Sequence, residues 1–343
     1  MRIASYHSNS DIRIEELPTP QVGPGESLVK IHASGICGSD IMEWYRRDKV
    51  PLVLGHEIAG EIAAVGPGVS NIQVGDRVVA SHHVPCLECR YCHRGHETVC
   101  QTLHTTTFDP GGFSQYVRLP QINTRLGVFP IPEDVTYEEA SFAEPLACVL
   151  RGQNRAKVSK GDTVAVIGSG ISGILHIALA RACGAKCIVA ADINEARLPW
   201  AEKFGADFTT NDSFSIPGLL LDNIGRKADI VILTTGHPKA VQAGFDAADE
   251  GATILLFAPS DPGTMIQINI TDLFFKHDRT ITTTYANSPS DLQQALVLLS
   301  EKKVVVKEMI THRIALDEIQ YGFDLVQHGF ESLKVIIEPN GSP

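Results

Sequence analysis

Short apolar runs rich in β-branched residues dominate the N-terminal third of the chain. They include SLVKIHA at 27–33, IAGEIAAV at 58–65 and RVVA at 77–80. Glycine- and proline-rich sequences separate these runs, for example VGPG at 22–25 and VGPGV at 65–69. Because such sequences favour tight turns between strands, we predict an antiparallel, barrel-like β domain with long loops.

The pattern changes after residue 133. The stretch EEASFAEPLACVLRGQNRA indicates a helix with one proline interruption. The apolar run TVAVI at 163–167 suits a buried parallel strand, and a helix-like stretch follows at 171–183. Further strand-like runs lie at 186–191, 229–233 and 253–257. This alternation predicts βαβ units and a doubly wound parallel sheet.

The C-terminal segment has a helical pattern at 291–300 and a final strand-like run, KVII, at 334–337. We expect it to return to the first domain. The predicted fold class is therefore α/β with two domains. The first domain comprises 1–148 completed by 288–343, and the cofactor domain comprises 149–287.

Length, composition and charge narrow the function classes. The 343 residues exceed the size at which a single core stops growing, which favours two domains. A net charge of −11 with no Lys/Arg stripe argues against nucleic acid as a partner. No apolar run is long enough to span a membrane, and the start lacks a secretory pattern, so we expect a cytoplasmic protein.

A glycine-rich motif follows the first predicted strand of the second domain and opens a predicted helix, which is the context that dinucleotide binding requires. Its G-x-G-x-x-G pattern is formed by Gly168, Ser169, Gly170, Ile171, Ser172 and Gly173. Asp192 ends the next strand and suits the ribose hydroxyls, which favours NAD over NADP; Arg197 can flank the adenosine. The alternative is a plain tight turn with Asp192 as a helix cap.

Four of the eight cysteines lie within one short segment, at Cys86, Cys89, Cys92 and Cys100. Four thiolates at this spacing can enclose one Zn²⁺ tetrahedrally and leave no open position, as structural sites do. A zinc-ribbon nucleic-acid module is the functional alternative. The acidic charge and the missing second half of such a module count against it.

A second group of metal-ligand residues is scattered along the chain. Cys37 lies in GICGSD, His56 and Glu57 follow in LGHE, and Glu144 begins EPL. A thiolate, an imidazole and a carboxylate can hold zinc with one position open. Spacing alone leaves the matter unsettled, because each residue also has an ordinary reading as core, surface or helix-cap residue.

Several motifs together settle the resemblance. The segments GICGSD (35–40), LGHEIAGEIAAVG (54–66), GDRVV (75–79), the four-cysteine lobe, AEPLAC (143–148) and VIGSGISG (166–173) occur in the order typical of the zinc-containing medium-chain dehydrogenases. The chain resembles this family over essentially its whole length. Glu144 stands where classical alcohol dehydrogenases carry a second cysteine, which makes the chain similar to the sorbitol and polyol dehydrogenase branch.

The resemblance implies a GroES-like catalytic domain, a Rossmann domain, two zinc ions per chain and hydride transfer between a secondary alcohol and NAD. Cys37, His56 and Glu144 would surround the catalytic zinc, with Glu57 coordinating it or lying just behind. Asp40 would orient His56, and Ser39 would carry the alcohol proton outward. Relatives are commonly tetramers or dimers, and we expect a homo-oligomer, with the tetramer favoured.

Two departures from the family pattern limit the substrate assignment. Met42 stands where relatives often place the histidine that finishes the proton relay, so that step is left to Glu43, solvent or a carboxylate at the metal. Thr284 replaces an arginine near the substrate of sorbitol dehydrogenases, which puts sorbitol itself in doubt. The loop segment YRRD at 45–48, with Arg46 and Arg47, can face the substrate site and hold an acidic substrate group, although a solvated turn is the simpler interpretation.

Other functions remain as alternatives. An L-threonine 3-dehydrogenase or another amino or cyclic alcohol dehydrogenase would share both sites. A non-catalytic NAD- or zinc-binding relative would not need Ser39 beside the ligand residues. Zinc-free quinone reductases of similar fold would need neither metal site. His82 and His83 can line the substrate site, but a histidine pair after a strand is more often structural.

Overall fold

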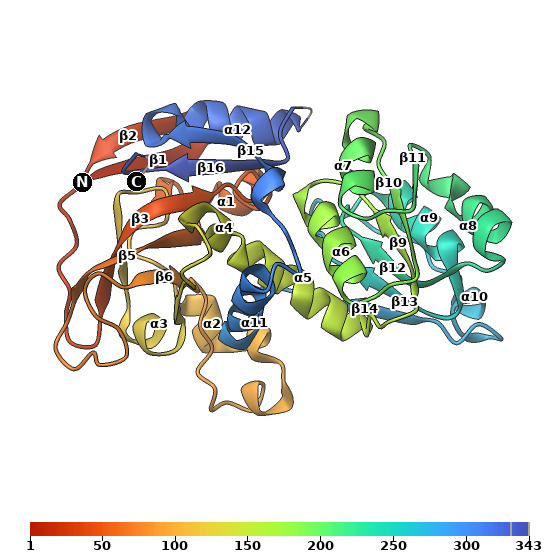
Figure 1. Cartoon of the computed structure of the whole chain (residues 1–343), viewed down its shortest axis with the longest axis horizontal. Coiled ribbons are helices and arrows are strands. Elements are labelled where there is room, and N and C mark those ends of the chain that lie inside the picture. Colours follow the sequence, from red (N-terminus) through yellow and green to blue (C-terminus); the bar gives the residue numbers. More distant parts are fainter. Residues whose placement is uncertain (330, 342–343) are drawn as a thin grey trace. The chain divides into compact units, whose positions relative to one another are not determined.

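The computed structural model describes residues 1–329 and 331–341, which form two compact units (Figure 1). The first unit comprises Met1–Ala147 and the described residues from Ala286 onward. The second unit comprises Cys148–Tyr285. The first unit is therefore built from both ends of the chain.

The first unit is mainly β-structure. Its strands are β1 (Arg2–Ser8), β2 (Asp11–Glu16), β3 (Ser27–Gly35), β4 (Leu52–Val53), β5 (Glu57–Val65), β6 (Arg77–Ala80), β7 (Tyr116–Leu119), β8 (Val128–Pro130), β15 (Ile310–Ala315) and β16 (Lys334–Glu338). Its helices are α1 (Glu43–Arg46), α2 (Gln101–Thr105), α3 (Gln121–Leu126), α4 (Tyr137–Ser141), α11 (Pro289–Ser300) and α12 (Ile319–His328). Short 3₁₀ turns are η1 (Cys92–Arg94), η2 (Glu97–Val99), η5 (Lys307–Met309) and η6 (Leu316–Glu318).

A seven-stranded sheet in the order β15-β16-β3-β5-β6-β8, with β7 also paired to β3, forms the body of this unit. All pairs are antiparallel except β15 with β16. The prediction of an antiparallel barrel-like domain is confirmed, and the one parallel pair is a detail it lacked. Alternate residues of β3, such as Val29 and Ile31, are buried in its core with Ile58 and Val117.

The C-terminal segment completes this sheet. Figure 1 shows the blue β15, β16 and α12 beside the red β1 and β3. Strand β16 pairs with β3 on one side and β15 on the other, so it occupies an interior position. A second core joins α12 to the small β2-β1-β4 sheet, through ring contacts of Phe323 with Tyr6 and Phe113.

The second unit is a parallel sheet between helices. Its strands are β9 (Thr163–Ile167), β10 (Cys187–Ala191), β11 (Phe208–Thr210), β12 (Ala228–Leu233), β13 (Ala248–Leu256) and β14 (Thr280–Thr283). Its helices are α6 (Ile171–Ala182), α7 (Leu198–Lys203), α8 (Ile216–Ile224), α9 (Pro238–Ala247) and α10 (Ile270–Phe274), with η3 (Glu195–Arg197) and η4 (Ser213–Ser215).

These six strands have the order β11-β10-β9-β12-β13-β14, and every pair is parallel. Numbered from β9, this is 3-2-1-4-5-6, the doubly wound order of dinucleotide-binding domains. Strands β9 and β10 are buried throughout, which explains their continuous apolar runs. The order reverses between β9 and β12, and ligands of such sheets bind outside the carboxyl ends of the strands at that point.

Helix α4 of the first unit is followed by α5 (Ala143–Ala156), which begins in the first unit and continues into the second. The predicted proline interruption was misplaced, because the break falls at Phe142 and Pro145 lies in the first turn of α5. Proline is tolerated there since a first-turn N–H has no partner within the helix.

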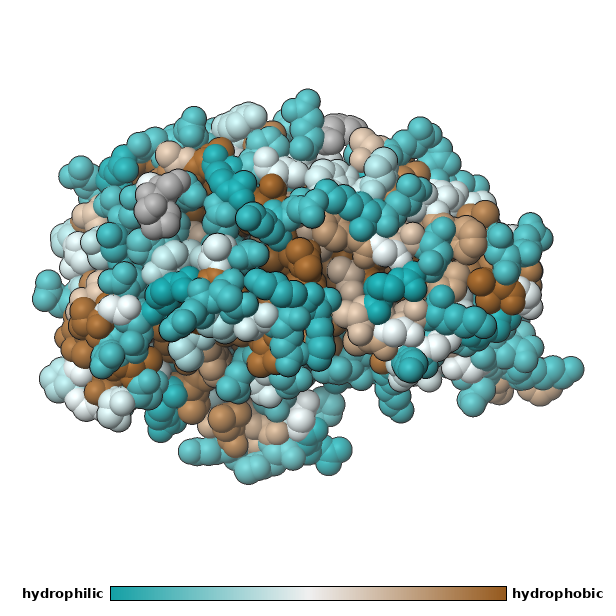
Figure 2. Space-filling view, viewed as in Figure 1, coloured by the Kyte–Doolittle hydropathy of each residue, from teal (hydrophilic) through white to brown (hydrophobic). Residues whose placement is uncertain are grey.

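Hydrophilic side chains predominate on the face drawn in Figure 2. Of the helices within the described residues, none has both the length and the apolar character to cross a membrane.

Candidate metal and cofactor sites

Cys37 lies in the turn that follows β3. Its backbone N–H donates to Asp40 Oδ2 at 3.0 Å, and the Ser39 N–H points at Cys37 Sγ at 3.5 Å. The side chain of Asp40 thus closes the turn from within, and it is completely buried. The turn fixes the thiol at the end of a core strand and leaves it half-buried.

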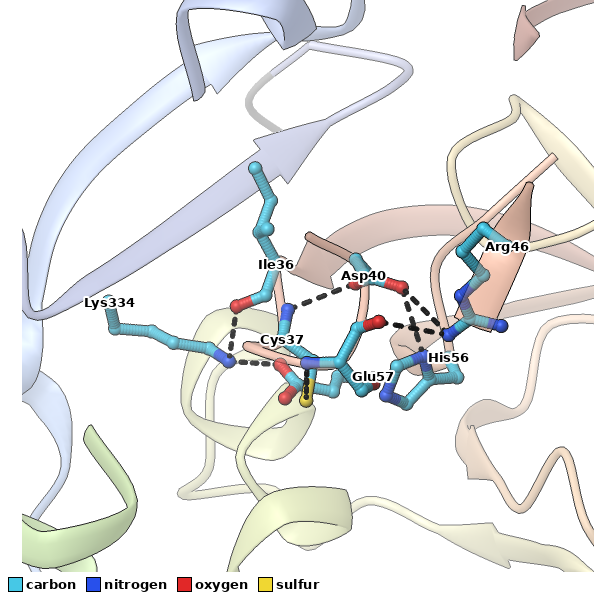
Figure 3. Close-up of polar contacts among 8 residues, drawn as sticks. Ile36, Cys37, Asp40, Arg46, His56, Glu57 and Lys334 are labelled. Carbon is cyan, nitrogen blue, oxygen red and sulfur yellow. Dashed lines mark hydrogen bonds and ion pairs between the residues drawn. The ribbon is translucent and has the colours of Figure 1, made fainter. Parts of the chain in front are cut away.

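Glu57 begins β5, the neighbour of β3 in the sheet, and His56 directly precedes this strand. One ligand atom each of Cys37, His56 and Glu57 lies within 4.8 Å of the others (Figure 3). His56 Nδ1 lies 3.5 Å from Asp40 Oδ1, so Nε2 is the nitrogen left for a metal ion. The turn after β3 and the start of β5, which are separate in the sequence, therefore bring a thiol, an imidazole and a carboxylate together.

Charges around Asp40 keep its carboxylate ionised. Burial by itself would raise the pKa of Asp40, but His56, the Cys37 N–H and Arg46 outweigh burial and lower the pKa. Arg46 Nη2 lies 3.9 Å from Asp40 Oδ1 and donates to the Ser39 carbonyl at 3.2 Å. Of the two arginines in the segment YRRD, Arg46 therefore faces the site and Arg47 is exposed.

Glu57 has a cationic partner that the sequence analysis did not identify. Lys334 Nζ donates to Glu57 Oε2 and, at 3.1 Å, to the Ile36 carbonyl (Figure 3). Both side chains are only 1% exposed. A Cβ at Gly35 would lie 2.0 Å from Glu57 Oε2, so glycine is needed where β3 passes this pair. A lysine within the apolar run LKVII was the available signal, because buried lysines need a partner.

Glu144 is buried but lies outside the three-residue group identified within the described part of the chain. It is in the first turn of α5, and its Oε1 accepts a hydrogen bond from Asn287 Nδ2 at 2.9 Å. Asn287 is also buried, and it directly precedes the N-cap of α11. The geometry thus favours Glu57 over Glu144 as the carboxylate of the metal site.

A histidine pair lies beside the ligand group. The ring of His82 is 4.9 Å from that of His56 and 3.8 Å from that of His83. Burial, with the charges of His83, His56 and Arg46, lowers the pKa of His82 well below its usual value. Burial also lowers the pKa of His83 to about 4, against a hydrogen bond to the Thr106 carbonyl. Both rings are therefore neutral around pH 7.

The four cysteines of the lobe converge. One sulfur from each of Cys86, Cys89, Cys92 and Cys100 lies within 4.8 Å of the others. Neighbouring sulfurs are 3.5, 3.6 and 4.0 Å apart. A tetrahedron with Zn–S bonds of about 2.3 Å has edges of about 3.8 Å, so these residues fit a zinc ion.

The glycine-rich turn joins β9 to α6 in the second unit. Gly168 has φ +100°, a left-handed conformation that other residues rarely adopt, and a Cβ on Gly173 would lie 1.9 Å from the Gly168 carbonyl oxygen. A Cβ on Gly170 would meet only the Arg197 guanidinium, at 3.8 Å, so the space above it is open for a ligand. Ile171 and Ser172 begin α6, whose first N–H groups have no partner within the helix.

The residues around this turn fit a dinucleotide. The Ser169 hydroxyl is buried and has no partner among the described residues. Asp192, just after β10, accepts hydrogen bonds from the N–H groups of Ser169 at 2.7 Å and Asn194 at 2.8 Å. Arg197 Nη1 lies 3.4 Å from Asp192 Oδ2. The carboxylate is thereby fixed at the edge of the turn.

Two sequence profiles match the chain. One, described as the alcohol dehydrogenase GroES-like domain, covers residues 23–133, and the other, described as zinc-binding dehydrogenase, covers 172–301. Sorbitol dehydrogenase of Bacillus subtilis (strain 168) is 33% identical over 99% of this chain and 98% of that protein. The chain belongs to the zinc-containing medium-chain alcohol dehydrogenase family.

Two further relatives define its neighbourhood. The L-threonine 3-dehydrogenase of Bacillus subtilis (strain 168) is 34% identical over 95% of this chain and 94% of that protein. The crystal structure of galactitol-1-phosphate dehydrogenase from Escherichia coli superimposes with a TM-score of 0.87 at 27% identity, covering 99% of this chain and all of that chain. This dehydrogenase is thus in the polyol branch of its family, and the family uses zinc and NAD(P).

Proposed function

We propose that this dehydrogenase interconverts a secondary alcohol of polyol type and the corresponding ketone, with zinc held by Cys37, His56 and Glu57. The convergence of these three ligand atoms within 4.8 Å carries the proposal. A thiolate, an imidazole and one carboxylate leave a fourth position open, as catalytic zinc sites require. Sorbitol and galactitol 1-phosphate, the substrates named for two relatives, set the substrate class.

Bound zinc supplies Lewis acidity towards the alcohol oxygen, and bound nicotinamide supplies the hydride acceptor. The chain's own residues orient these groups. Asp40 holds His56 through Nδ1, and the Ser39 hydroxyl, two residues from Cys37, receives the alcohol proton. Beyond Ser39, the position that would follow in the relay holds Met42, so the proton continues to solvent or to a carboxylate.

The activity is tested by NAD reduction at saturating cofactor with a panel of free polyols, polyol phosphates, inositols, simple secondary alcohols and L-threonine. The expected result is zinc-dependent turnover of the polyols. Turnover of L-threonine alone would support the amino-alcohol alternative, which the 34% identity to an L-threonine 3-dehydrogenase favours. Absence of turnover with every alcohol in zinc-loaded protein would contradict the proposal.

We infer a preference for NAD over NADP from Asp192. Its buried carboxylate lies at the end of β10, where it can accept hydrogen bonds from ribose hydroxyls and would repel a 2′-phosphate. Arg197 flanks the adenosine side and partly offsets this repulsion. The glycine turn from Gly168 to Gly173 holds the pyrophosphate at the start of α6.

We also infer that the lobe of Cys86, Cys89, Cys92 and Cys100 holds a structural zinc ion, which gives two ions per chain. Four sulfur ligands would complete the tetrahedral coordination of the ion and leave no open position on it. Four thiolate ligands require a reducing compartment, which supports a cytoplasmic location.

A second copy of the chain is the partner we propose for the edge of the parallel sheet. Within the described residues strand β14 pairs only with β13, and α10, which precedes it in the chain, has exposed apolar residues, with Ile270 69% and Phe274 62% exposed. Unpaired edges and apolar patches are normally covered. Symmetric pairing there gives a dimer, and the tetramer that we favour needs one further interface.

Sedimentation of the double variant Ile270→Asp/Phe274→Asp tests the interface. It is expected to shift the protein to monomer, whereas Leu221→Asp, an equally apolar exposed position in α8, leaves assembly unchanged. An unchanged oligomer in the double variant would refute this interface.

A further inference from the structure

The imidazole of His82 is the feature of the first unit that the assigned roles leave unused. Its ring stacks at 3.8 Å on that of His83 and lies 4.9 Å from that of His56, with Phe108 at 5.9 Å on another side. Hydrogen bonds found within the described residues engage its backbone carbonyl but neither of its ring nitrogens. An unused imidazole thus lies directly beside a ligand of the metal site.

The backbone that carries His82 is fixed by side chains from other elements. Asn123 Nδ2 donates to the carbonyls of Ser81 at 2.9 Å and His82 at 3.1 Å. The Ser81 hydroxyl donates to the His83 carbonyl at 2.8 Å, and the Ser81 N–H donates to the Gly127 carbonyl. Asn123 itself is fully buried in α3. The position of the ring is therefore set before any ligand binds, as a selective binding group requires.

His82 and His83 differ in what their nitrogens do. His83 Nδ1 is bound to the Thr106 carbonyl at 2.9 Å, so that ring ties the turn to the four-cysteine lobe. His82 retains both nitrogens, and an imidazole offers one donor and one acceptor, which matches the two hydrogen-bonding roles of a hydroxyl group. His83 therefore serves the structure, while His82 is available to a ligand.

We propose that His82 is a specificity-determining residue that hydrogen-bonds the hydroxyl adjacent to the reacting carbinol, so that the enzyme prefers vicinal diols to simple secondary alcohols. The inference rests on the proposed function, because it places the carbinol at Cys37, His56 and Glu57. A ring this close to a ligand imidazole can reach the neighbouring hydroxyl, whereas one several carbons away lies beyond hydrogen-bond reach.

The test compares 2,3-butanediol with 2-butanol, which share a carbon skeleton and differ in one hydroxyl. His82→Phe keeps the ring packing and removes both nitrogens. The ratio of kcat/KM values for diol and mono-alcohol is expected to fall about tenfold, since one hydrogen bond to the second hydroxyl is lost. His82→Gln, which retains a donor and an acceptor, is expected to restore part of the ratio.

His83→Phe is the matched control. It removes the nitrogen bound to Thr106, so it lowers Tm, but the substrate ratio is expected to match that of the wild-type protein. Equal ratios in wild type and His82→Phe would overturn the proposal. A fall of the same size in His83→Phe would overturn it too, because the effect would then come from the stack and not from the unused nitrogens.

A second measurement needs no turnover. The Tm of zinc-loaded protein without NAD is measured with each alcohol at equal concentration, and 2,3-butanediol is expected to raise Tm more than 2-butanol in wild type but not in His82→Phe. Diol-selective binding without oxidation of any alcohol would reject the proposed function and keep the role of His82. If wild type and His82→Phe oxidise both alcohols with the same ratio of kcat/KM values and show the same Tm shifts, the role of His82 is rejected and the proposed function stands.

Discussion

Lys334 and Glu57 form an ion pair that is buried from solvent on both sides, and the pair joins the last described strand of the chain to the metal-binding strand. Lys334 also donates to the carbonyl of Ile36, one residue before Cys37. The ammonium group thus fixes both edges of the candidate catalytic site. Lys334 contacts Oε2 of Glu57, so the other carboxylate oxygen would be the one available to a metal ion.

Replacing Lys334 by methionine is expected to lower the free energy of unfolding by about 3–5 kcal/mol, because Glu57 would remain buried without a cation. Urea denaturation of metal-free protein measures the change, because a zinc ion bound at Glu57 would itself supply a cation. Arg2→Met provides the control, since its pair with Asp317 is 41% and 55% exposed and should contribute no more than about 1 kcal/mol. Equal losses of unfolding free energy in the two variants would show that the buried Lys334 pair stabilises the fold no more than the exposed Arg2 pair does.

Replacing Cys37 by alanine is expected to reduce the zinc content from two ions per chain to one and to abolish alcohol oxidation, because the thiolate ligand is lost. Metal analysis by plasma spectrometry measures the first effect. Cys183→Ala, at the exposed end of α6, should retain both ions. Cys92→Ser should also bind one ion, but with a marked fall in Tm as the lobe loses its centre. Wild-type activity in Cys37→Ala would exclude the site.

Asp192→Ser is expected to weaken NAD binding about tenfold and to narrow the discrimination against NADP, since the hydrogen-bonding carboxylate and its repulsion of a 2′-phosphate both disappear. Dissociation constants for both cofactors, measured by fluorescence titration, report the change. Asp222→Ser, on the exposed face of α8, serves as the control. Unaltered constants for both cofactors in Asp192→Ser would remove this residue from the cofactor site.

His176 in α6 makes the second unit sensitive to acid. Its side chain is completely buried, and burial lowers its pKa to about 3. The unfolded chain takes up a proton near pH 6.5 that the folded chain takes up only near pH 3. Stability is therefore complete above pH ~6.5 and decreases as the pH falls through this window, by up to about 1.4 kcal/mol per unit.

The variant His176→Leu keeps the packing against Phe257 and removes the titration. Urea denaturation between about pH 7 and pH 5 is expected to give a shallower slope of stability against pH than in wild type. His328→Leu, which changes an exposed histidine, should leave the slope intact. Parallel slopes for wild type and His176→Leu would contradict the assignment.

The sequence predicted those parts of the fold that are determined by residues close together along the chain. The strand at 163–167 was placed without error, and the helix at 171–183 differs by one residue at its end, because apolar period and glycine signals act over a few positions. The break between α4 and α5 was predicted at Pro145 but lies at Phe142, because proline is tolerated in the first turn of a helix. Strand β2 escaped notice because charged residues occupy its exposed positions, and β1 because its buried run Ile3–Tyr6 includes a serine and shows no alternation.

The candidate sites divide in the same way. The four-cysteine lobe and the glycine turn are short-range patterns, and the sequence alone indicated both. The choice between Glu57 and Glu144 depends on partners such as Lys334 and Asn287, which lie far along the chain and have no fixed spacing. The sequence did not distinguish Arg46 from Arg47, because which of two adjacent side chains turns inward depends on the conformation of α1.

The interior place of β16 bears on how the protein is made. Lys334 leaves the ribosome 277 residues after Glu57, which at roughly 5–20 residues per second is a delay of about 14–55 s. Throughout that interval the whole cofactor unit emerges while the carboxylate lacks its ammonium partner. The end of β3 that pairs with β16 therefore stays without this partner until β16 is synthesised, and the first unit is completed after the cofactor unit that interrupts it.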